Sequence, residues 1–429
     1  MRFQTIIISA ILILVALIAC RDKVTQPYIK SIWLSAEDIG VTDAFIHIIL
    51  SNDTKSSNFS LKLNGKTIFN ASARDTLIFS DSLLPKHTYT YRAYRLNGAI
   101  VFDSSDALTI STLDTTSHNF TWEIDTLGDG NSSVLYDVAI INDTLAYAVG
   151  EIYKKDSTEQ FETEFYNIAK WNGSAWKFER IYYPYQGQNY IAPLHSIYAF
   201  SKNDIWVGSN QPMHWNGSEW RTFDLLSSVW NGWINKIWGT SSTNIYIVGN
   251  QGAIAFFNGS SWQKIESRTT TDIMDAWGIF NPTTNRTEVY CAVTSFWTPQ
   301  DKKILKIVSS STVDSVAWTT GRDVVSIWTP NGFPLFTAGD GVFENKTGRW
   351  REMDVGANIY TQRIRGNSRN DIIAIGGFEL IAHYNGLSWR VIQLNMSSTV
   401  GYPGLAVSDR LVVVVGGDIS RAIVSIGKR

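Results

Sequence analysis

The feature that most constrains the fold is an internal repeat that runs from about residue 119 to the last residue. Each unit contains an apolar strand, a polar turn, a second apolar strand that ends in Gly, a third strand, and an Asn-Gly turn followed by Trp; residues 237–262 are a clear copy. Most of the closing glycines are roughly 40 to 50 residues apart, and the first interval is longer because of a polar insertion at 154–164. The repeat predicts seven units, whose marking positions are Gly150, Gly208, Gly249, Ala292 (a degenerate copy), Gly339, Gly376 and Gly416.

This spacing is typical of four-stranded β-propeller blades. The units resemble bacterial propeller repeats that carry an Asn-Gly-x-x-Trp turn, and they are distantly kelch-like. The seventh unit stops at 424–427 without its last strand, whereas an unassigned strand at 119–124 precedes the first unit. We expect this strand to complete the seventh blade from the N-terminal side, which removes an open sheet edge. Residues 119–429 are therefore predicted to form a seven-bladed β-propeller with N-terminal strand closure.

Residues 1–19 have the pattern of a signal peptide, because a short positive start precedes an apolar run that is too short to span a bilayer as a helix. The run ends in Leu-Ile-Ala-Cys at Cys20, which resembles the lipobox of bacterial lipoproteins. The resemblance implies cleavage before Cys20, diacylation of its thiol, a lipidated tether over 20–27 and anchoring in the bacterial cell envelope, at the outer membrane or the cell surface. The alternative is an ordinary secretory signal with an incidental cysteine.

Residues 28–113 contain short strands of alternating hydrophobicity, and the Asn-Gly pair at 64–65 predicts a tight hairpin turn between two of them. The run Leu-Leu-Pro-Lys-His-Thr-Tyr at 83–89 resembles the L-x-P-x-x-x-Y motif of fibronectin type III domains, which are Ig-like β-sandwiches. The resemblance implies a tyrosine corner at Tyr89 and a role as a spacer or binding unit. The family's second-strand Trp is missing here, and we expect Trp33 to fill its volume.

Composition agrees with an all-β protein and excludes one class of partner. The formal net charge is −2, so the chain carries no basic footprint for nucleic acid. The 17 Trp residues and the frequent Asn-Gly turns favour strands over helices. Besides Cys20 there is only Cys291, which lies in an apolar stretch and is expected to be a small core residue rather than a catalytic thiol.

One repeat position at the end of the first strand supplies the candidate site residues. They are Tyr198, Trp238, Trp277, Trp328 and Arg365. Aromatic side chains there could ring the central channel and stack on sugar faces, or they could fill the gaps between neighbouring blades, and packing is the favoured interpretation. Arg365 at this position suggests that the strand end reaches solvent, because a long cation is rarely buried without a partner.

Motifs for catalysis or metal binding are absent from the sequence. The six His residues are scattered without H-x-x-x-H or H-E-x-x-H spacing, and there is no G-x-S-x-G elbow. We therefore expect no cofactor and no metal. The favoured function is a non-catalytic envelope lipoprotein whose propeller binds a protein or glycan ligand. The alternative is a polysaccharide hydrolase or lyase with its active site at the channel mouth, since two acidic residues can pair in space without a sequence signature.

Overall fold

The computed structural model describes residues 31–51, 57–73, 75–185, 187–281, 285–295, 301–309, 312–394 and 399–429. Within these residues the regular structure consists of β-strands and one short 3₁₀ turn, η1 (Asn250–Gly252). This part of the chain contains no helix with the length and apolar character needed to cross a membrane. The all-β class predicted from the sequence is confirmed. The signal peptide, Cys20 and the tether lie outside the described residues.

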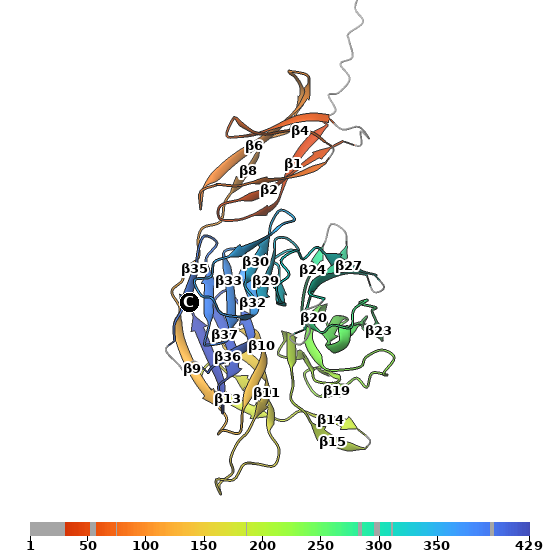
Figure 1. The fold of residues 1–429 in the computed structure, drawn as a ribbon, viewed down its shortest axis with the longest axis vertical. Coiled ribbons are helices and arrows are strands. Elements are labelled where there is room, and N and C mark those ends of the chain that lie inside the picture. The colour runs from red at the N-terminus through yellow and green to blue at the C-terminus, as the bar shows by residue number, and fades with distance from the viewer. Residues whose placement is uncertain are drawn as a thin grey trace, which may run out of the picture. The chain divides into compact units, whose positions relative to one another are not determined.

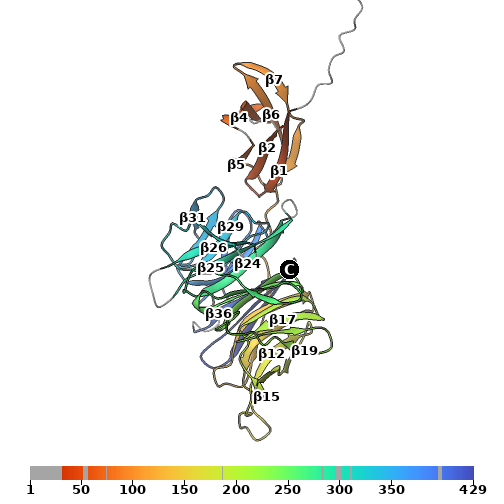
Figure 2. The ribbon, with the colours of Figure 1, turned by 90° about the vertical axis from the view of Figure 1, so that its right-hand side faces the viewer.

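The chain divides into two compact units. The first unit takes residues up to Ile39, Ala44–Asp81 and His87–Ser111, and the second takes Gly40–Asp43, Ser82–Lys86 and Thr112–Arg429. The first unit contains two antiparallel sheets, with strand orders β1-β2-β5 and β4-β3-β6-β7, and β8 also pairs with β6 (Figure 2). Its strands are β1 (Ile32–Ile39), β2 (Ala44–Leu50), β3 (Ser57–Leu63), β4 (Lys66–Ala73), β5 (Thr76–Ser80), β6 (Thr88–Asn97), β7 (Ile100–Ser104) and β8 (Leu108–Ser111).

The core of the first unit corrects one expectation. The hairpin between β3 and β4 turns at Asn64 and Gly65 with positive φ angles of 47° and 84°, as the Asn-Gly pair predicts. Trp33, however, is 40% exposed and does not fill the core. Side chains alternate between the two faces of a strand, so the complete burial of Ile32 turns its neighbour Trp33 outward. Branched side chains such as Ile46, with 0% exposure, occupy the interior instead.

The second unit contains seven four-stranded antiparallel sheets among its described residues, and a separate hairpin, β14-β15. We number the sheets in chain order. Sheet 1 is β10 (Val134–Asn142), β11 (Leu145–Ile152), β12 (Tyr166–Trp171) and β13 (Trp176–Glu179); the hairpin is β14 (Tyr182–Tyr185) and β15 (Gln188–Ile191); sheet 2 is β16 (Ser196–Ser201), β17 (Asp204–Gly208), β18 (Pro212–Trp215) and β19 (Trp220–Thr222); sheet 3 is β20 (Ile234–Ser241), β21 (Asn244–Gly249), β22 (Ile254–Phe257) and β23 (Trp262–Lys264).

The remaining sheets follow the same order of strands. Sheet 4 is β24 (Ile273–Asn281), β25 (Arg286–Val293), β26 (Lys303–Ser309) and β27 (Thr312–Val316); sheet 5 is β28 (Val324–Trp328), β29 (Leu335–Gly339), β30 (Val342–Asn345) and β31 (Trp350–Met353); sheet 6 is β32 (Thr361–Ser368), β33 (Asp371–Gly376), β34 (Ile381–Tyr384) and β35 (Trp389–Ile392); sheet 7 is β36 (Gly401–Val407), β37 (Leu411–Gly417), β38 (Ala422–Lys428) and β9 (Thr121–Leu127). The first strand of each sheet contacts the first strand of the next, and β36 contacts β10, so the sheets form a closed ring.

The closing strand has the predicted partner. Strand β9 pairs antiparallel with β38, from Leu127 opposite Ala422 to Thr121 opposite Lys428, and completes sheet 7. In Figure 1 the orange strand β9 lies beside the blue strands from the end of the chain. The expected closure of the last unit by residues before the first one is therefore confirmed, and β38 is paired along both of its edges.

The structure explains two features that recur in the repeat, the Gly near the end of the second strand and the Asn-Gly turn. A Cβ atom at Gly249 would lie 2.0 Å from the carbonyl oxygen of Trp233, and one at Gly416 would lie 1.9 Å from that of Gly401. At these two positions the second strand approaches the start of the first strand so closely that only Gly fits. In the Asn-Gly turns the Asn side chain binds the turn backbone, as where Asn172 Oδ1 accepts from the Ala175 N–H at 2.9 Å.

Candidate binding site in the central channel

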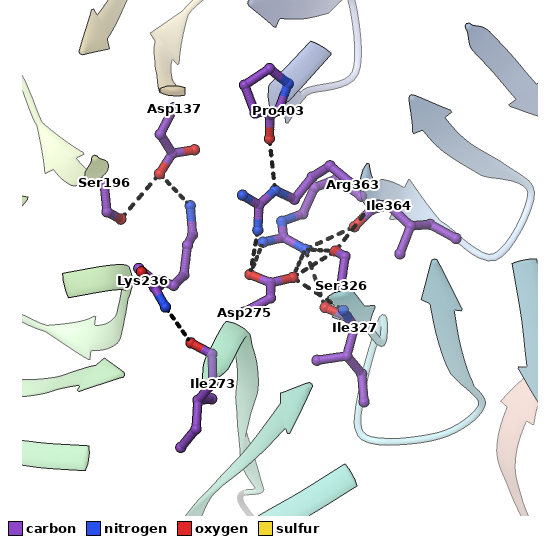
Figure 3. Close-up of polar contacts among 12 residues, drawn as sticks. Asp137, Ser196, Lys236, Ile273, Asp275, Ser326, Ile327, Arg363, Ile364 and Pro403 are labelled. Atoms are coloured by element: carbon purple, nitrogen blue, oxygen red, sulfur yellow. Dashed lines mark hydrogen bonds and ion pairs between the residues drawn. The ribbon is translucent and has the colours of Figure 1, made fainter. Parts of the chain in front are cut away.

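A single repeat position lines the centre of the ring with buried polar side chains. It lies two residues before the aromatic position that the sequence singled out. The residues at this position are Asp137, Ser196, Lys236, Asp275, Ser326, Arg363 and Gly404, one from the first strand of each sheet. Six of the seven are polar, and each of those six is at most 9% exposed. Buried polar side chains need partners, and these residues supply them to one another (Figure 3).

The first group joins sheets 1, 2 and 3. Asp137 Oδ2 accepts from Ser196 Oγ at 3.1 Å, from the Ile197 N–H at 3.0 Å and from Lys236 Nζ at 2.5 Å. Ser196 Oγ in turn accepts from the Ile237 N–H at 2.9 Å. One carboxylate and one hydroxyl therefore bind three successive sheets.

The second group repeats this arrangement in sheets 4, 5 and 6. Asp275 Oδ2 accepts from Ser326 Oγ at 2.6 Å and from the Ile327 N–H at 3.1 Å. Arg365 donates to both carboxylate oxygens of Asp275, at 2.9 and 2.7 Å. Ser326 Oγ accepts from the N–H of the residue before Arg365 at 3.2 Å, just as Ser196 does three sheets earlier. An aspartate, a serine and a cation thus recur in the same order on both sides of the channel.

Arg363 adds a second cation to Asp275. Its Nη1 lies 3.0 Å from Asp275 Oδ1, and its Nε donates to the carbonyl of Pro403 at 3.0 Å, which extends the network to sheet 7. Burial alone would raise the pKa of Asp275, but Arg365 and Arg363 hold the pKa of this carboxyl far below its usual range. Burial lowers the pKa of the Lys236 amine, and Asp137 opposes that shift. The channel core is an ion-pair network in which Asp275 stays ionised.

A cavity of about 180 Å³ opens above this network. Lys236 and Arg365 line it together with Tyr198 and Trp277. Aliphatic residues of β10 and β36 form other parts of its wall: Val138, Ala139, Ile140, Leu405, Ala406 and Val407. The cavity therefore combines two aromatic side chains, an apolar wall and two cations. Asp137 and Asp275 partly neutralise the charges of Lys236 and Arg365.

Three of the five candidate residues named from the sequence meet at this cavity: Tyr198, Trp277 and Arg365. Burial raises the pKa of the Tyr198 phenol to about 12, so it remains protonated at neutral pH. The Trp277 indole is partly buried, and its Nε1 donates to the Thr329 carbonyl at 3.1 Å. The Arg365 guanidinium lies 4.8 Å from the centre of the Trp277 ring, a cation–π contact.

The other two candidate residues pack between sheets. Trp238 and Trp328 are only 3% and 2% exposed. A Cβ atom at Gly278 of sheet 4 would lie 2.7 Å from the Trp238 ring, and one at Gly366 of sheet 6 would lie 2.8 Å from the Trp328 ring. Each indole therefore fills the space beside a glycine of the next sheet and has no free face for a sugar.

The expectation that Arg365 marks a strand end in solvent is wrong. The residue is 4% exposed, and Asp275 supplies the missing counter-charge. The sequence reasoning did not identify the polar position at all. Its signal was present, because aligning the first strands on the candidate position places Lys236, Asp275 and Arg363 two residues before Trp238, Trp277 and Arg365.

Neither a cluster of metal ligands nor a reactive thiolate is found among the residues that the structure describes. Among them there is no group of three or more His, Cys, Asp or Glu side chains that could hold a metal ion. Cys291 is fully buried, and burial raises the pKa of its thiol far above the usual range, which disfavours the reactive thiolate. Both channel carboxylates are bound to cations.

Comparisons with known proteins identify the fold. No protein-family model matches the chain, and no curated protein matches it. A solved structure described as YCF48 bound to D1 peptide is similar over 73% of this chain and 97% of that chain, with a TM-score of 0.55 and 13% sequence identity. A computationally designed protein, Ika8, matches over 70% of this chain and 98% of its own, with a TM-score of 0.45 and 13% identity. The repeated four-stranded sheets and the likeness to YCF48, itself a β-propeller, show that the second unit has a β-propeller fold.

Proposed function

We propose that the chain is a lipid-anchored protein of the bacterial envelope whose propeller is a non-catalytic binding module. The observation that carries this proposal is the cavity at one end of the central channel, where Tyr198, Trp277 and Arg365 meet an apolar wall. Pockets of this mixed composition bind a ligand group by burying its apolar part and orienting it through a few polar contacts.

We also propose that the propeller has seven blades and that the first unit is a fibronectin type III-like sandwich. Seven four-stranded sheets with β9 completing the last one support a seven-bladed propeller. The two sheets of the first unit, with orders β1-β2-β5 and β4-β3-β6-β7, support a fibronectin type III-like sandwich. Such a domain would serve as a spacer between the acylated Cys20 and the propeller.

A peptide segment of a partner protein fits the cavity best. A volume of about 180 Å³ accommodates one large side chain or a chain end rather than an extended polymer. The aromatic and aliphatic walls favour an apolar side chain, and Lys236 and Arg365 favour a carboxylate beside it. The structural likeness to a propeller solved with a bound peptide supports this ligand class, although the likeness itself concerns only the fold.

The channel carboxylates support a non-catalytic role. A glycosidase needs one carboxylic acid that remains protonated near neutral pH as a proton donor. Asp275 has a lowered pKa and accepts from Arg365, while Asp137 is engaged by Lys236. Neither side chain has the environment of a general acid.

A cavity-filling substitution tests the binding site. Peptides would first be selected by display on the full-length protein purified in detergent. Ala406→Trp places an indole in the cavity and should weaken binding of the selected peptide by about tenfold or more. The matched control is Ala357→Trp, at a partly buried alanine in a different pocket of the propeller, which should leave the affinity unchanged. Equal affinities for both variants would place the ligand elsewhere.

Membrane anchoring has a separate test. Cys20→Ser removes the thiol that acylation needs and should release the protein from the membrane fraction. Metabolic labelling with a palmitate analogue should mark the parent protein and fail on the variant. A variant that stays entirely with the membranes, from a parent that takes no label, would refute the lipid anchor.

A further inference from the structure

The first strands of sheets 1 to 3 carry a second aromatic group at the ends opposite to the cavity. Tyr136 and His195 stack with ring centres 4.7 Å apart, and Trp233 meets His195 edge-on at 5.2 Å. The three residues stand at the start of β10 or directly before β16 and β20, whereas the cavity residues stand later in the first strands. They therefore form an aromatic row across three neighbouring sheets at the other mouth of the channel.

Trp233 is unusual among the Trp residues of the described chain. It is 42% exposed, and among the described Trp residues only Trp33 of the first unit, at 40%, is comparably exposed. The backbone that carries this indole is held on both sides by hydrogen bonds. The Trp233 carbonyl accepts from the Asn250 N–H at 3.3 Å, and the N–H of the next residue, Ile234, donates to the Ser209 carbonyl at 2.8 Å. Anchoring of this kind prepares a large apolar surface before any ligand arrives.

The loop that presents Trp233 is itself fixed. Trp230 is buried, with 3% exposure, and its Nε1 donates to the Gly232 carbonyl at 3.0 Å. The N–H groups of Val229 and Trp230 both donate to the Leu226 carbonyl, at 2.8 and 2.9 Å, which closes a turn. The indole of Trp233 therefore extends from a loop with its own buried anchor.

A cavity of about 340 Å³ adjoins Trp233 and contains no charged side chain in its lining. Its lining includes Asn210, Gln211, Leu225, Ser227, Asn231 and Trp233. Gln211 Oε1 accepts from the Leu225 N–H at 2.9 Å, which fixes the side-chain amide and leaves its NH₂ group to donate. The lining thus offers amide and hydroxyl groups around an exposed aromatic face.

This combination matches the surface of a neutral sugar. A pyranose ring has an apolar C–H face that packs on an indole, and its hydroxyls exchange hydrogen bonds with amides. The row beyond Trp233 is also uncharged near neutral pH, because burial lowers the pKa of His195 and raises that of Tyr136. An anionic ligand would meet no cation among the residues that line the cavity.

We propose that the Trp233 surface, defined by Trp233 with Asn210, Gln211 and Asn231, is a binding site for neutral glycans. It is separate from the cavity of the proposed function and does not depend on it. Stacking on Trp233 would supply most of the affinity, and the three amides would orient the sugar hydroxyls. The stacked rings of His195 and Tyr136 would extend the contact surface toward a second sugar unit.

The test uses full-length protein in detergent and isothermal titration with linear hexasaccharides. Neutral hexasaccharides of glucose, xylose and mannose are compared with the anionic hexasaccharide of galacturonic acid. We expect binding of at least one neutral sugar, loss of about tenfold or more in affinity for Trp233→Ala, and a smaller loss for Gln211→Leu. Trp33→Ala, the matched exposed Trp, should bind like the parent.

The outcomes separate this proposal from its alternatives. Trp233→Ala should keep a melting temperature close to that of the parent, because 42% of this residue is exposed, so a large loss of affinity in a folded variant would report the contact itself. Ala406→Trp should keep sugar binding, which separates this site from the channel cavity. Absence of binding by all neutral sugars, binding of the anionic sugar alone, or full affinity in Trp233→Ala would overturn the proposal. So would a selected peptide whose binding requires Trp233 while no sugar binds.

Discussion

Lys236 and Asp137 form a buried ion pair across the propeller channel, with Lys236 Nζ 2.5 Å from Asp137 Oδ2 and side-chain exposures of 6% and 1%. They belong to sheets 3 and 1, and Ser196 of the sheet between them binds the same carboxylate oxygen. The pair therefore links non-adjacent sheets, which backbone pairing within each sheet cannot do.

Removal of the cation should strongly destabilise the propeller. Lys236→Met leaves the Asp137 carboxylate buried without its counter-charge, and we expect a loss of about 3–5 kcal/mol in the free energy of unfolding. Adding Asp137→Asn should recover part of this loss, because the unpaired charge disappears. Urea denaturation provides the measurement. The control, Lys177→Met, breaks an exposed pair with Glu179 and should cost less than about 1 kcal/mol; equal losses would contradict a structural role for the channel pair.

The two buried indoles and the cavity indole should respond differently to truncation. Trp328 is 2% exposed against Gly366, so Trp328→Ala should lower the unfolding free energy by about 3–5 kcal/mol. Trp277 is only partly buried, and Trp277→Ala should produce a smaller loss together with weaker ligand binding. Thermal melting of both variants measures the two losses in stability. A larger loss for Trp277 would show that this residue is primarily a packing element.

The closing strand should matter more to the propeller than the whole first domain. Deleting residues 119–126 removes most of β9 and leaves β38 as an open edge. Deleting 21–113 removes the strands of the first unit, which pair among themselves in their own sheets, together with two short segments of the second unit, Gly40–Asp43 and Ser82–Lys86. We expect the first deletion to lower the melting temperature of the propeller more sharply than the second. The closure would have no energetic role if both shortened proteins melted at the same temperature.

A histidine pair predicts sensitivity to acid. Nδ1 of His118 lies 2.8 Å from Nδ1 of His383, so one nitrogen must donate and the other must accept without a proton. Burial, followed by His383, Arg390 and Arg429, lowers the pKa of His118. The unfolded histidine, with a pKa near 6.5, therefore takes up its proton at a higher pH than the folded one.

The sign of this linkage is fixed by the direction of the shift. The stability that His118 contributes is complete above about pH 6.5 and decreases as the pH falls below that value. His195, whose pKa burial also lowers, adds a change of the same sign. Unfolding free energies at pH 8 and pH 5.5 should differ less in His118→Gln than in the parent. The exposed His87→Gln is the control and should keep the parental difference; an unchanged pH response in His118→Gln would refute this linkage.

Local pattern in the sequence was sufficient to predict the sheets and the closing strand. The recurring Gly residues and Asn-Gly turns are required by contacts within one unit, such as that of Gly249 with the Trp233 carbonyl. A single copy of the repeat is therefore enough to recognise them. The fourth strand of sheet 7 was predictable because the seventh unit lacked its last strand, whereas the strand at 119–124 belonged to no other unit.

The channel network and the Trp233 surface were not predictable in this way. The partner that buries Arg365 is Asp275, 90 residues earlier in the chain, and neither residue type alone indicates such a pair. The burial of Trp328 depends on Gly366 in the next sheet, and the exposure of Trp233 depends on the loop that carries it. These are properties of how units meet, which the pattern within a unit does not contain.

The central claim, a ligand site in the channel cavity, is tested most directly by hydrogen exchange of the full-length protein with and without a display-selected peptide. The account predicts slower exchange on peptide binding in backbone amides at the cavity wall, in residues 138–140 and 405–408, with no change at 231–233. Protection confined to 231–233, or protection that persists in Ala406→Trp, would contradict the proposed site.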